Sequence, residues 1–228
     1  MVTEYDFRAE EAIRKMIADK YPDHNLLGEE RGFENKNSRY TWIIDPLDGT
    51  SNFAAGIPWF GILIALVDGS EAILGGAYLP ITDEMYLAEK GKGATKNGIK
   101  INCTPETELR NLLFCYSLDY SPDIAFTESE VQIIKVLVNN CRNLRVTNSC
   151  LDFCLVAEGK LGIAVNQNMK IWDIAAPLIL MEEAGVRVTD IHGKRIDLSP
   201  SDRILNTNYP SIAANPVVHA KVMGLIGG

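Results

Sequence analysis

The sequence has few of the features of secreted, membrane-spanning or nucleic-acid-binding proteins. It contains five cysteines, an odd number with no Cys-x-x-Cys pair, which argues against a disulfide framework. No apolar run approaches the roughly 20 residues that a membrane helix needs. Residues 60–67 form one of the longest runs, and Asp68-Gly69 ends it. The start shows no signal peptide, and no basic patch indicates nucleic acid. We therefore expect a soluble, cytoplasmic protein without a membrane or nucleic-acid partner.

Positive charge and histidine are also scarce. The 228 residues include 22 Lys and Arg against 30 Asp and Glu, a formal net charge of −8. The three histidines, His24, His192 and His219, lie outside every motif of the chain, so none is a candidate base or metal ligand. There is no repeat, linker or low-complexity segment. With 46% hydrophobic residues, the chain can bury one large core or two fused halves.

The most informative stretch is WIIDPLDGTSNF, in which an apolar strand leads into an acidic turn. Residues 41–44 are apolar and β-branched, which predicts a short buried strand. Pro46 cannot continue a central strand, so we expect Asp45 at the strand's end. Gly49 permits backbone geometry that is closed to other residues, and Thr50 can cap the helical turn that follows. The stretch therefore predicts a site for hard cations and a phosphate.

Two other interpretations fit this turn less well. An EF-hand calcium loop needs acidic or polar ligands at alternating positions and a glutamate at the twelfth. Counted from Asp45, the third residue is Leu47 and the twelfth is Gly56, so the turn is not an EF-hand. A plain surface turn with two solvated aspartates is the other alternative, because turns often contain Asp and Gly. The preceding strand and the acidic residues elsewhere in the chain argue against it.

Two further acidic elements lie elsewhere in the chain. The triplet GEE at residues 28–30 follows a predicted amphipathic helix that Tyr21-Pro22 ends. Taken alone, a Glu pair in a loop is usually solvated surface. Residues 171–177 lead into a predicted helix that Gly185 stops. By itself, Asp173 could be only the N-cap of that helix.

Together these elements resemble the inositol monophosphatase superfamily, the magnesium-dependent, lithium-sensitive sugar phosphatases. The family pattern is Gly-Glu-Glu, then Asp-Pro-hydrophobic-Asp-Gly-Thr-x-Asn-Phe, then Trp-Asp-x-Ala with Glu-Ala-Gly closing the last helix. This chain has these motifs in the same order, at residues 28–30, 45–53, 172–175 and 183–185. The resemblance covers nearly the whole chain, and its central motif is highly specific.

The resemblance implies an α/β (α+β) fold, the layered α-β-α-β-α sandwich of the inositol monophosphatase and fructose-1,6-bisphosphatase type. Residues 2–6 resemble the family's Val-Thr-x-x-Asp element, and because the chain begins there, we expect the leading N-terminal helix to be missing. We expect a single unit over residues 1–228. Its N-terminal half, about 1–120, would carry most of the metal site, and its C-terminal half, about 121–228, would contribute Asp173.

The resemblance also implies a ligand set for Mg²⁺. Glu29, Asp45 and the backbone carbonyl of Leu47 would hold a first ion. Asp45 would bridge to a second ion, completed by Asp48 and Asp173, and a third, weaker ion would lie near Glu29. Magnesium prefers such oxygen ligands, and two ions can activate a bound water for in-line displacement. They would also reverse the negative local charge that otherwise repels a phosphate.

Other residues would position the reactants. Thr50 and Glu29 would orient the attacking water, and the backbone amides of Gly49 and Thr50 would bind the phosphate. Asp6 would steady the Thr50 hydroxyl, and Glu30 would support the metal ligands from behind. The predicted catalytic residues are Glu29, Asp45, Asp48, Thr50 and Asp173. The predicted substrate-binding residues are Asp48, Gly49, Thr50, Ser149, Asn166 and Asp173.

The alcohol-binding side departs from the family pattern. The family commonly has Gly-Ser or Gly-Thr followed by Ala-Ala where this chain has TNSC at residues 147–150. Inositol-preferring members carry a glutamate seven residues before the late aspartate, and Asn166 stands at that position here. An amide can donate and accept hydrogen bonds but carries no charge. We expect the phosphate chemistry to survive these changes, whereas the identity of the substrate's alcohol stays open.

The function predicted from these residues is that of a Mg²⁺-dependent phosphomonoesterase acting on a small polyol or sugar phosphate. Inositol monophosphate is the first candidate and fructose 1,6-bisphosphate the second. A catalytically weak metal-binding or interaction protein of the same fold is the alternative from another class. A haloacid-dehalogenase-type phosphatase is disfavoured, because its loop reads Asp-x-Asp-Gly-Thr, while two residues separate Asp45 from Asp48. Family members are commonly homodimers, and we expect one here.

Overall fold

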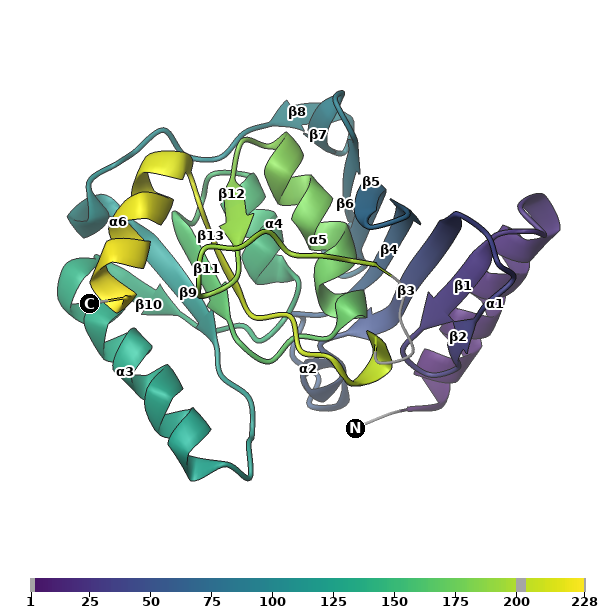
Figure 1. Ribbon diagram of the computed structural model, residues 1–228, viewed down its shortest axis with the longest axis horizontal. Helices are drawn as coiled ribbons and strands as arrows, with labels where there is room; N and C mark the ends of the chain where they lie inside the picture. Colours follow the sequence, from purple (N-terminus) through teal and green to yellow (C-terminus); the bar gives the residue numbers. More distant parts are fainter. Residues whose placement is uncertain (1–2, 200–203, 228) are drawn as a thin grey trace.

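A computed structural model describes residues 3–199 and 204–227, which contain six α-helices and two β-sheets. The helices are α1 (Glu4–Lys20), α2 (Thr50–Ala54), α3 (Ile124–Asn140), α4 (Leu151–Ala157), α5 (Ile171–Glu183) and α6 (Pro216–Ile226). Helix α1 covers the first sheet, α4 and α5 lie between the sheets, and α3 and α6 cover the second sheet (Figure 1). This order of layers confirms the predicted α-β-α-β-α sandwich.

The first sheet has eight strands in the order β2-β1-β3-β4-β5-β6-β7-β8. They are β1 (Asn25–Gly28), β2 (Gly32–Glu34), β3 (Tyr40–Asp48), β4 (Gly61–Asp68), β5 (Glu71–Leu79), β6 (Glu84–Glu89), β7 (Gly93–Lys96) and β8 (Ile99–Ile101). Strands β1 and β3 are parallel, with Gly28 opposite Ile44. Parallel neighbours end on the same side of a sheet. Glu29, which follows β1, therefore lies beside Asp45, and its backbone N–H donates to the Ile44 carbonyl at 3.3 Å.

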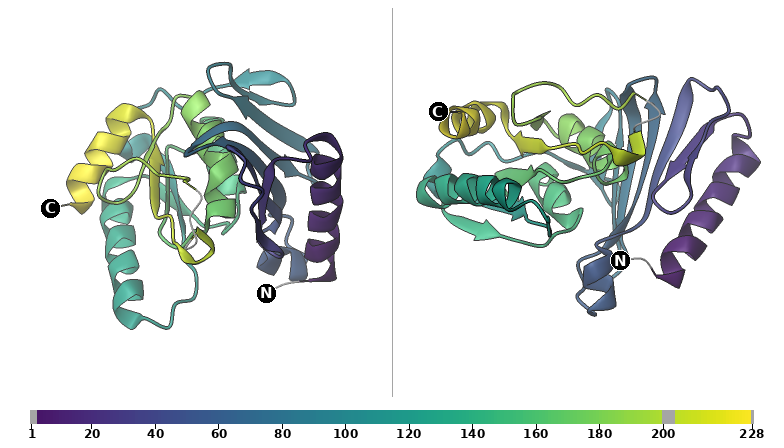
Figure 2. Two further views of the ribbon diagram at one scale, coloured as in Figure 1. Left: turned by 45° about the vertical axis from the view of Figure 1, so that its right-hand side comes forward. Right: turned by 60° about the horizontal axis from the view of Figure 1, so that its bottom comes forward.

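The second sheet has the order β10-β9-β11-β13-β12. Its strands are β9 (Leu113–Ser117), β10 (Asn143–Arg145), β11 (Ile163–Asn166), β12 (Arg187–Thr189) and β13 (Ser211–Ala214). Strand β9 is parallel to both β10 and β11, so the carboxyl ends of these three strands meet at one edge. Clefts of open α/β sheets form at such edges. Figure 2 shows this sheet and the first sheet on opposite sides of α5.

Helix α1 begins with a capping box. The Thr3 hydroxyl accepts a hydrogen bond from a backbone N–H of the first turn, and the Asp6 carboxylate accepts one from the Thr3 N–H at 2.8 Å. These bonds satisfy backbone donors that a helix start leaves free. The helix ends at Lys20, before Pro22, as the sequence predicts. Val2, the first residue of the predicted Val-Thr-x-x-Asp element, lies outside the described residues.

Strand β3 does not end at Asp45, so that prediction is wrong. It continues through Pro46 to Asp48, and its pairing with β4 shifts between these residues. Asp45 lies opposite Leu63 and Asp48 opposite Gly61, so three steps along β3 match two along β4. This is a β-bulge, one of the few places where a strand tolerates proline. Residues three apart in a regular strand point to opposite faces, and the extra residue turns both aspartates to the same side.

Helix α5 is the centre of the core. Nine of its 13 residues are buried, as a helix between two sheets requires. It lies so close to β5 that a Cβ added to Gly75 would be 2.4 Å from a methyl group of Ile179. The helix begins at Ile171, so its N-cap is Lys170, and the interpretation of Asp173 as an N-cap is wrong. No helix of the described residues, α5 included, is long and apolar enough to cross a membrane.

Candidate active site

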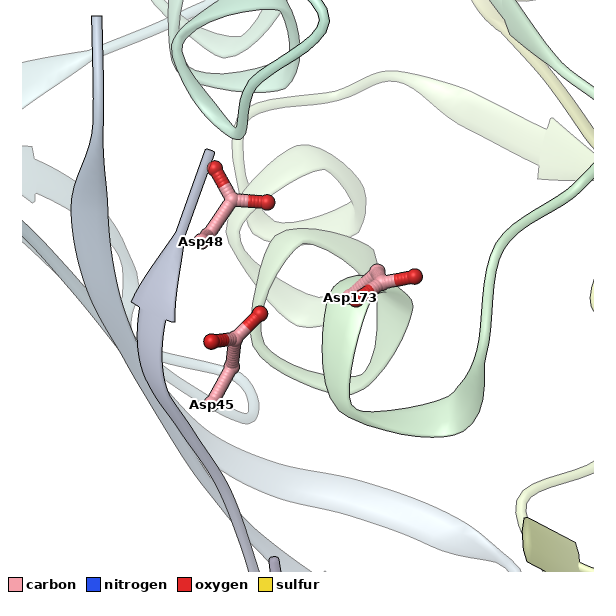
Figure 3. Close-up of side chains that lie close together, drawn as sticks. All are labelled: Asp45, Asp48 and Asp173. Carbon is pink, nitrogen blue, oxygen red and sulfur yellow. The ribbon is translucent and has the colours of Figure 1, made fainter. Parts of the chain in front are cut away.

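Three aspartates from distant parts of the chain meet between β3 and α5 (Figure 3). One carboxylate oxygen from each of Asp45, Asp48 and Asp173 lies within 4.8 Å of the others. Asp45 and Asp48 come from the bulged end of β3, and Asp173 comes from the first turn of α5. Carboxylates at this separation repel one another unless a cation lies among them. The arrangement suits a divalent cation with oxygen ligands.

Backbone hydrogen bonds hold each of the three carboxylates. Asp45 and Asp173 each accept one bond from a nearby N–H, at 3.0 and 2.7 Å respectively. Asp48 Oδ2 accepts two bonds, from the N–H of Cys150 at 2.5 Å and from the hydroxyl of Ser149 at 3.0 Å. Each bond fixes one oxygen and leaves the other oxygen of the same carboxylate available to a cation.

Burial and mutual repulsion raise the pKa values of the cluster. Burial, followed by the charge of Asp48, raises the pKa values of both Asp45 and Asp173 well above the ordinary range. Burial also raises the pKa of Asp48, although its hydrogen bonds oppose the shift. Desolvation at the pocket wall, together with the charge of Glu30, raises the pKa of Glu29 to about 7. The site therefore holds more negative charge than its protein surroundings stabilise, which favours a bound cation.

We expect the carboxylates of the site to stabilise the metal-free protein as the pH falls from about 7 toward about 5, whereas buried His219, whose pKa burial lowers, acts in the opposite direction. A carboxyl group with a raised pKa binds its proton more tightly in the folded protein than in the unfolded chain. The free energy of unfolding therefore rises as the pH falls between two pKa values. The upper one is that of the folded protein, about 7 for Glu29, and the lower one is that of the unfolded chain, near 4. Mg²⁺ binds the ionised carboxylates and should remove most of this dependence.

Thermal unfolding between about pH 8 and about pH 5, with EDTA and with Mg²⁺, tests this expectation. The variant Asp173→Asn lacks one of the carboxyl groups with a raised pKa and should show a weaker pH dependence. An equal pH dependence of Tm in the metal-free wild type and in Asp173→Asn would contradict the expectation.

A pocket of about 520 Å³ opens beside the three aspartates. The predicted site residues in its lining are Glu29, Asp48, Gly49, Thr50, Ser149, Asn166 and Asp173. Asp45 is buried beneath the lining, and Asp6, Glu30 and Leu47 lie outside it. The structure therefore places every predicted substrate-binding residue around one cavity.

The start of α2 forms one wall of the pocket. Gly49 has a φ of +81°, and a Cβ there would lie 2.7 Å from the Trp59 carbonyl oxygen, so the position requires glycine. The Thr50 hydroxyl lies 2.9 Å from the Leu47 carbonyl and 3.4 Å from Asp6 Oδ1, both of which are acceptors. The hydrogen of this hydroxyl is therefore donated to the protein, and its oxygen can accept a hydrogen bond from a molecule in the pocket.

Glu10 supports the site but belongs to no motif of the sequence. It is fully buried, and it accepts hydrogen bonds from the Glu30 N–H at 2.8 Å and from Arg14 Nε at 2.6 Å. A Cβ added to Gly28 would lie 2.1 Å from Glu10 Oε1. The carboxylate therefore holds residues 28–30 from below. The signal that could have revealed it is the spacing of Asp6 and Glu10, two acids four residues apart on the buried face of α1.

Glu10→Ala is expected to destabilise the protein by about 2–4 kcal/mol, because it leaves Arg14 Nε and the N–H of Glu30 without their acceptor. Glu11→Ala is the matched control, since Glu11 lies on the same helix with a 71% exposed side chain. It should cost less than about 0.5 kcal/mol. Urea unfolding measures both effects, and equal midpoints for the two variants would contradict the supporting role of Glu10.

The opposite wall of the pocket comes from the second sheet. Ser117 and Asn166 end the parallel strands β9 and β11, face each other in register and line the pocket. Asp119 and Asn168 follow these strands and line it as well. Asn52 joins the two walls, because its Nδ2 donates to a backbone carbonyl of the loop after β10 at 2.9 Å. Apart from Asn166, the sequence did not predict these residues, although the carboxyl ends of parallel strands are a general signal for binding residues.

The chain is similar to known proteins over most of its length. A family profile described as the inositol monophosphatase family matches residues 1–224. A protein of Aquifex aeolicus named fructose-1,6-bisphosphatase/inositol-1-monophosphatase is 37% identical over 186 residues, which cover 81% of this chain and 70% of that protein. A histidinol-phosphatase of Chlorobaculum parvum is 36% identical over 199 residues, which cover 85% and 74% of the two chains.

Solved structures share the fold. The extragenic suppressor protein suhB from Bartonella henselae superposes with a TM-score of 0.89 at 29% identity, covering 99% of this chain and 84% of that chain. An IMPase/NADP phosphatase complexed with Mg²⁺ and phosphate superposes with a TM-score of 0.83 at 27% identity, covering 98% and 81%. The second of these structures holds the kind of cation that the three aspartates suit.

Proposed function

The chain belongs to the inositol monophosphatase family, and from that premise we propose that it hydrolyses a small polyol or sugar phosphate with Mg²⁺ as cofactor. The observation that carries the proposal is the cluster of Asp45, Asp48 and Asp173 within 4.8 Å, beside a pocket of about 520 Å³. Inositol monophosphate is the first candidate substrate.

The residues of the cluster fit magnesium, because they offer only oxygen ligands and their raised pKa values leave negative charge to be balanced. Glu29, Asp45 and the Leu47 carbonyl would hold one ion, and Asp45, Asp48 and Asp173 a second, with a third, weaker ion near Glu29. When bound, the ions supply Lewis-acid stabilisation of the phosphate and a water of lowered pKa.

The protein's own groups would position the reactants. The Thr50 hydroxyl donates its hydrogen within the protein, so its oxygen can accept a hydrogen bond from the attacking water and, together with Glu29, orient it. Asp6 keeps this hydroxyl in place. The N–H groups of Gly49 and Thr50 would donate to the phosphate. No nucleophilic side chain is required, since water attacks the phosphorus.

The polar lining of the pocket supports a hydroxylated substrate. Ser149 and Asn166 can each donate and accept hydrogen bonds with hydroxyl groups. Fructose 1,6-bisphosphate is the second candidate, favoured by the name of the Aquifex aeolicus relative. We also propose that the chain works as a single unit, because residues of both halves line the pocket. From family membership we expect a homodimer and inhibition by lithium at the second ion's position.

Phosphate release with and without Mg²⁺ tests the proposal, with inositol 1-phosphate, fructose 1,6-bisphosphate and histidinol phosphate as substrates. We expect release from inositol 1-phosphate that depends on Mg²⁺ and decreases with lithium. If calorimetry shows Mg²⁺ binding while none of the esters is hydrolysed, the proposed activity is wrong and a metal-binding interaction protein is the better description.

A further inference from the structure

Asp119 is the one charged residue in the pocket lining that does not belong to the proposed metal site. The other charged lining residues are Glu29, Asp48 and Asp173, and within the described ranges no lysine, arginine or histidine lines the pocket. The remaining polar lining is uncharged and includes Asn52, Asn148, Asn166, Asn168, Ser117 and Ser149. Apart from the proposed metal ligands, the lining is therefore rich in amides and hydroxyls and carries a single negative charge, that of Asp119.

The chain fixes Asp119 at the pocket wall. Asp119 lies two residues beyond the end of β9, and its Oδ1 accepts a hydrogen bond from Asn148 Nδ2 at 3.1 Å. The same amide group donates to the Leu118 carbonyl at 2.9 Å, so it holds the segment at two points. Asp119 is otherwise exposed, and its Oδ2 has no hydrogen-bond partner among the residues that the structure describes. That oxygen is available to a substrate.

No lysine, arginine or histidine of the described residues lines the pocket beside Asp119. The charge balance of the pocket otherwise depends on the proposed Mg²⁺ ions and so rests on the proposed function. The three proposed Mg²⁺ ions would carry six positive charges and so balance the four carboxylates of the proposed metal site and about two negative charges of the substrate's phosphate. Asp119 would then remain as an uncompensated negative charge in the pocket lining. Two basic residues adjoin lining residues in the sequence, Arg145 and Lys170. Arg145 donates to the Leu144 carbonyl at 2.8 Å, Lys170 donates to Asn208 Oδ1 at 2.7 Å, and neither lines the pocket.

We propose that Asp119 makes the pocket select substrates by the charge on the alcohol part of the phosphate ester. It favours phosphate esters whose alcohol carries a protonated amine, accepts neutral polyols, and rejects esters that carry a second phosphate. An ammonium group pairs with Asp119 Oδ2, whereas a second phosphate meets a like charge and finds no cation in the lining. Fructose 1,6-bisphosphate, the second candidate substrate, therefore ranks below inositol monophosphate, and amino-alcohol phosphates are added as a substrate class of this pocket.

The test uses pairs of substrates that differ only in charge. The first pair is 2-aminoethyl phosphate and 2-hydroxyethyl phosphate, and the second pair is their four-carbon homologues, which reach farther from the phosphate. For the wild type with Mg²⁺, we expect kcat/KM to be about threefold higher for the amine in at least one pair. The difference should lie mainly in KM, and it should shrink between about 50 mM and about 500 mM salt.

Variants of Asp119 separate its charge from its structural contacts. Asp119→Asn keeps an oxygen for Asn148 but no charge, so the ratio of amine to hydroxyl substrates should fall to about one. Asp119→Lys should raise kcat/KM for fructose 1,6-bisphosphate, a gain that loss of folding cannot produce. Asp19→Asn is the matched control, because Asp19 is an exposed carboxylate of α1 outside the pocket lining. It should leave every ratio unchanged.

Two results would overturn the inference while leaving the proposed function intact. One is a wild type that hydrolyses inositol 1-phosphate but shows no amine preference in either pair. The other is an amine preference that persists unchanged in Asp119→Asn. Absence of Mg²⁺-dependent release from every monophosphate, inositol 1-phosphate included, would instead overturn the proposed function and the inference together.

Discussion

Asp45→Asn is expected to lower kcat at least about a thousandfold with every ester that the wild type hydrolyses, a loss of about 4 kcal/mol of transition-state stabilisation. Asp45 is the residue that both proposed ions share, and its carboxylate lies within 4.8 Å of Asp48 and Asp173. An amide offers one oxygen and no charge, so it cannot bridge two divalent cations. Metal-ion catalysis is worth several kcal/mol, which this variant removes. Steady-state kinetics at saturating Mg²⁺ measure the effect.

The fold of this variant should survive. Asparagine has nearly the volume of aspartate, and its oxygen can still accept the hydrogen bond from the Leu47 N–H, which is 3.0 Å long in the wild type. The substitution also removes one buried charge beside Asp48. The Tm of the metal-free variant should therefore equal or exceed that of the wild type, while the increase in Tm on addition of Mg²⁺ disappears.

Asp152→Asn is the matched control for Asp45→Asn. Asp152 and Asp45 are each 1% exposed, but Asp152 lies in α4, outside both the cluster and the pocket lining. Its Oδ2 accepts a hydrogen bond from the lining residue Ser117 at 3.4 Å, and asparagine keeps an acceptor for that bond. This variant should keep the increase in Tm with Mg²⁺ and most of the activity. Mg²⁺-dependent turnover by Asp45→Asn at the wild-type rate would show that Asp45 does not bridge the ions.

The acidic motifs could be recognised in the sequence because each is a short contiguous segment at the end of a strand or the start of a helix. The predicted strand before Asp45 and the end of α1 before Pro22 depend on local rules for apolar runs and proline, and the structure contains both. Local rules could not bring Asp173 to Asp45, because their meeting depends on the packing of α5 between two sheets. That expectation came from the family resemblance.

The supporting contacts had no local signal. The bulge around Pro46 arises from the pairing of β3 with β4, which the residues of β3 alone do not specify. Ser149 donates to Asp48 across 101 residues of chain, so no spacing within either segment predicts the bond. From the sequence, Asp119 has the features of a solvated loop residue. Only the parallel pairing of β9 and β11 places it beside the residues that follow β11. The motifs thus predict which acidic side chains form the site, whereas the contacts that support those side chains depend on how the chain folds.

Thr50→Ala is expected to lower kcat about a hundredfold with little change in KM, as for the loss of a group that directs proton movement in the transition state. The Thr50 hydroxyl donates toward the Leu47 carbonyl at 2.9 Å and toward Asp6 Oδ1 at 3.4 Å, which leaves its oxygen as an acceptor for the attacking water. Alanine removes this acceptor, while the N–H of residue 50 stays available to the phosphate. Steady-state kinetics with inositol 1-phosphate separate the two parameters.

Thr50→Ser is the control, because serine keeps the hydroxyl and removes only a methyl group. It should retain most of the wild-type kcat, and the Mg²⁺-induced increase in Tm should be similar in the two variants, since neither removes a proposed metal ligand. A rise in KM alone in Thr50→Ala would assign the hydroxyl to substrate binding. A contact that is equally strong in the ground state and the transition state changes KM and leaves kcat unaltered, whereas a contact to the attacking water matters only as the water attacks.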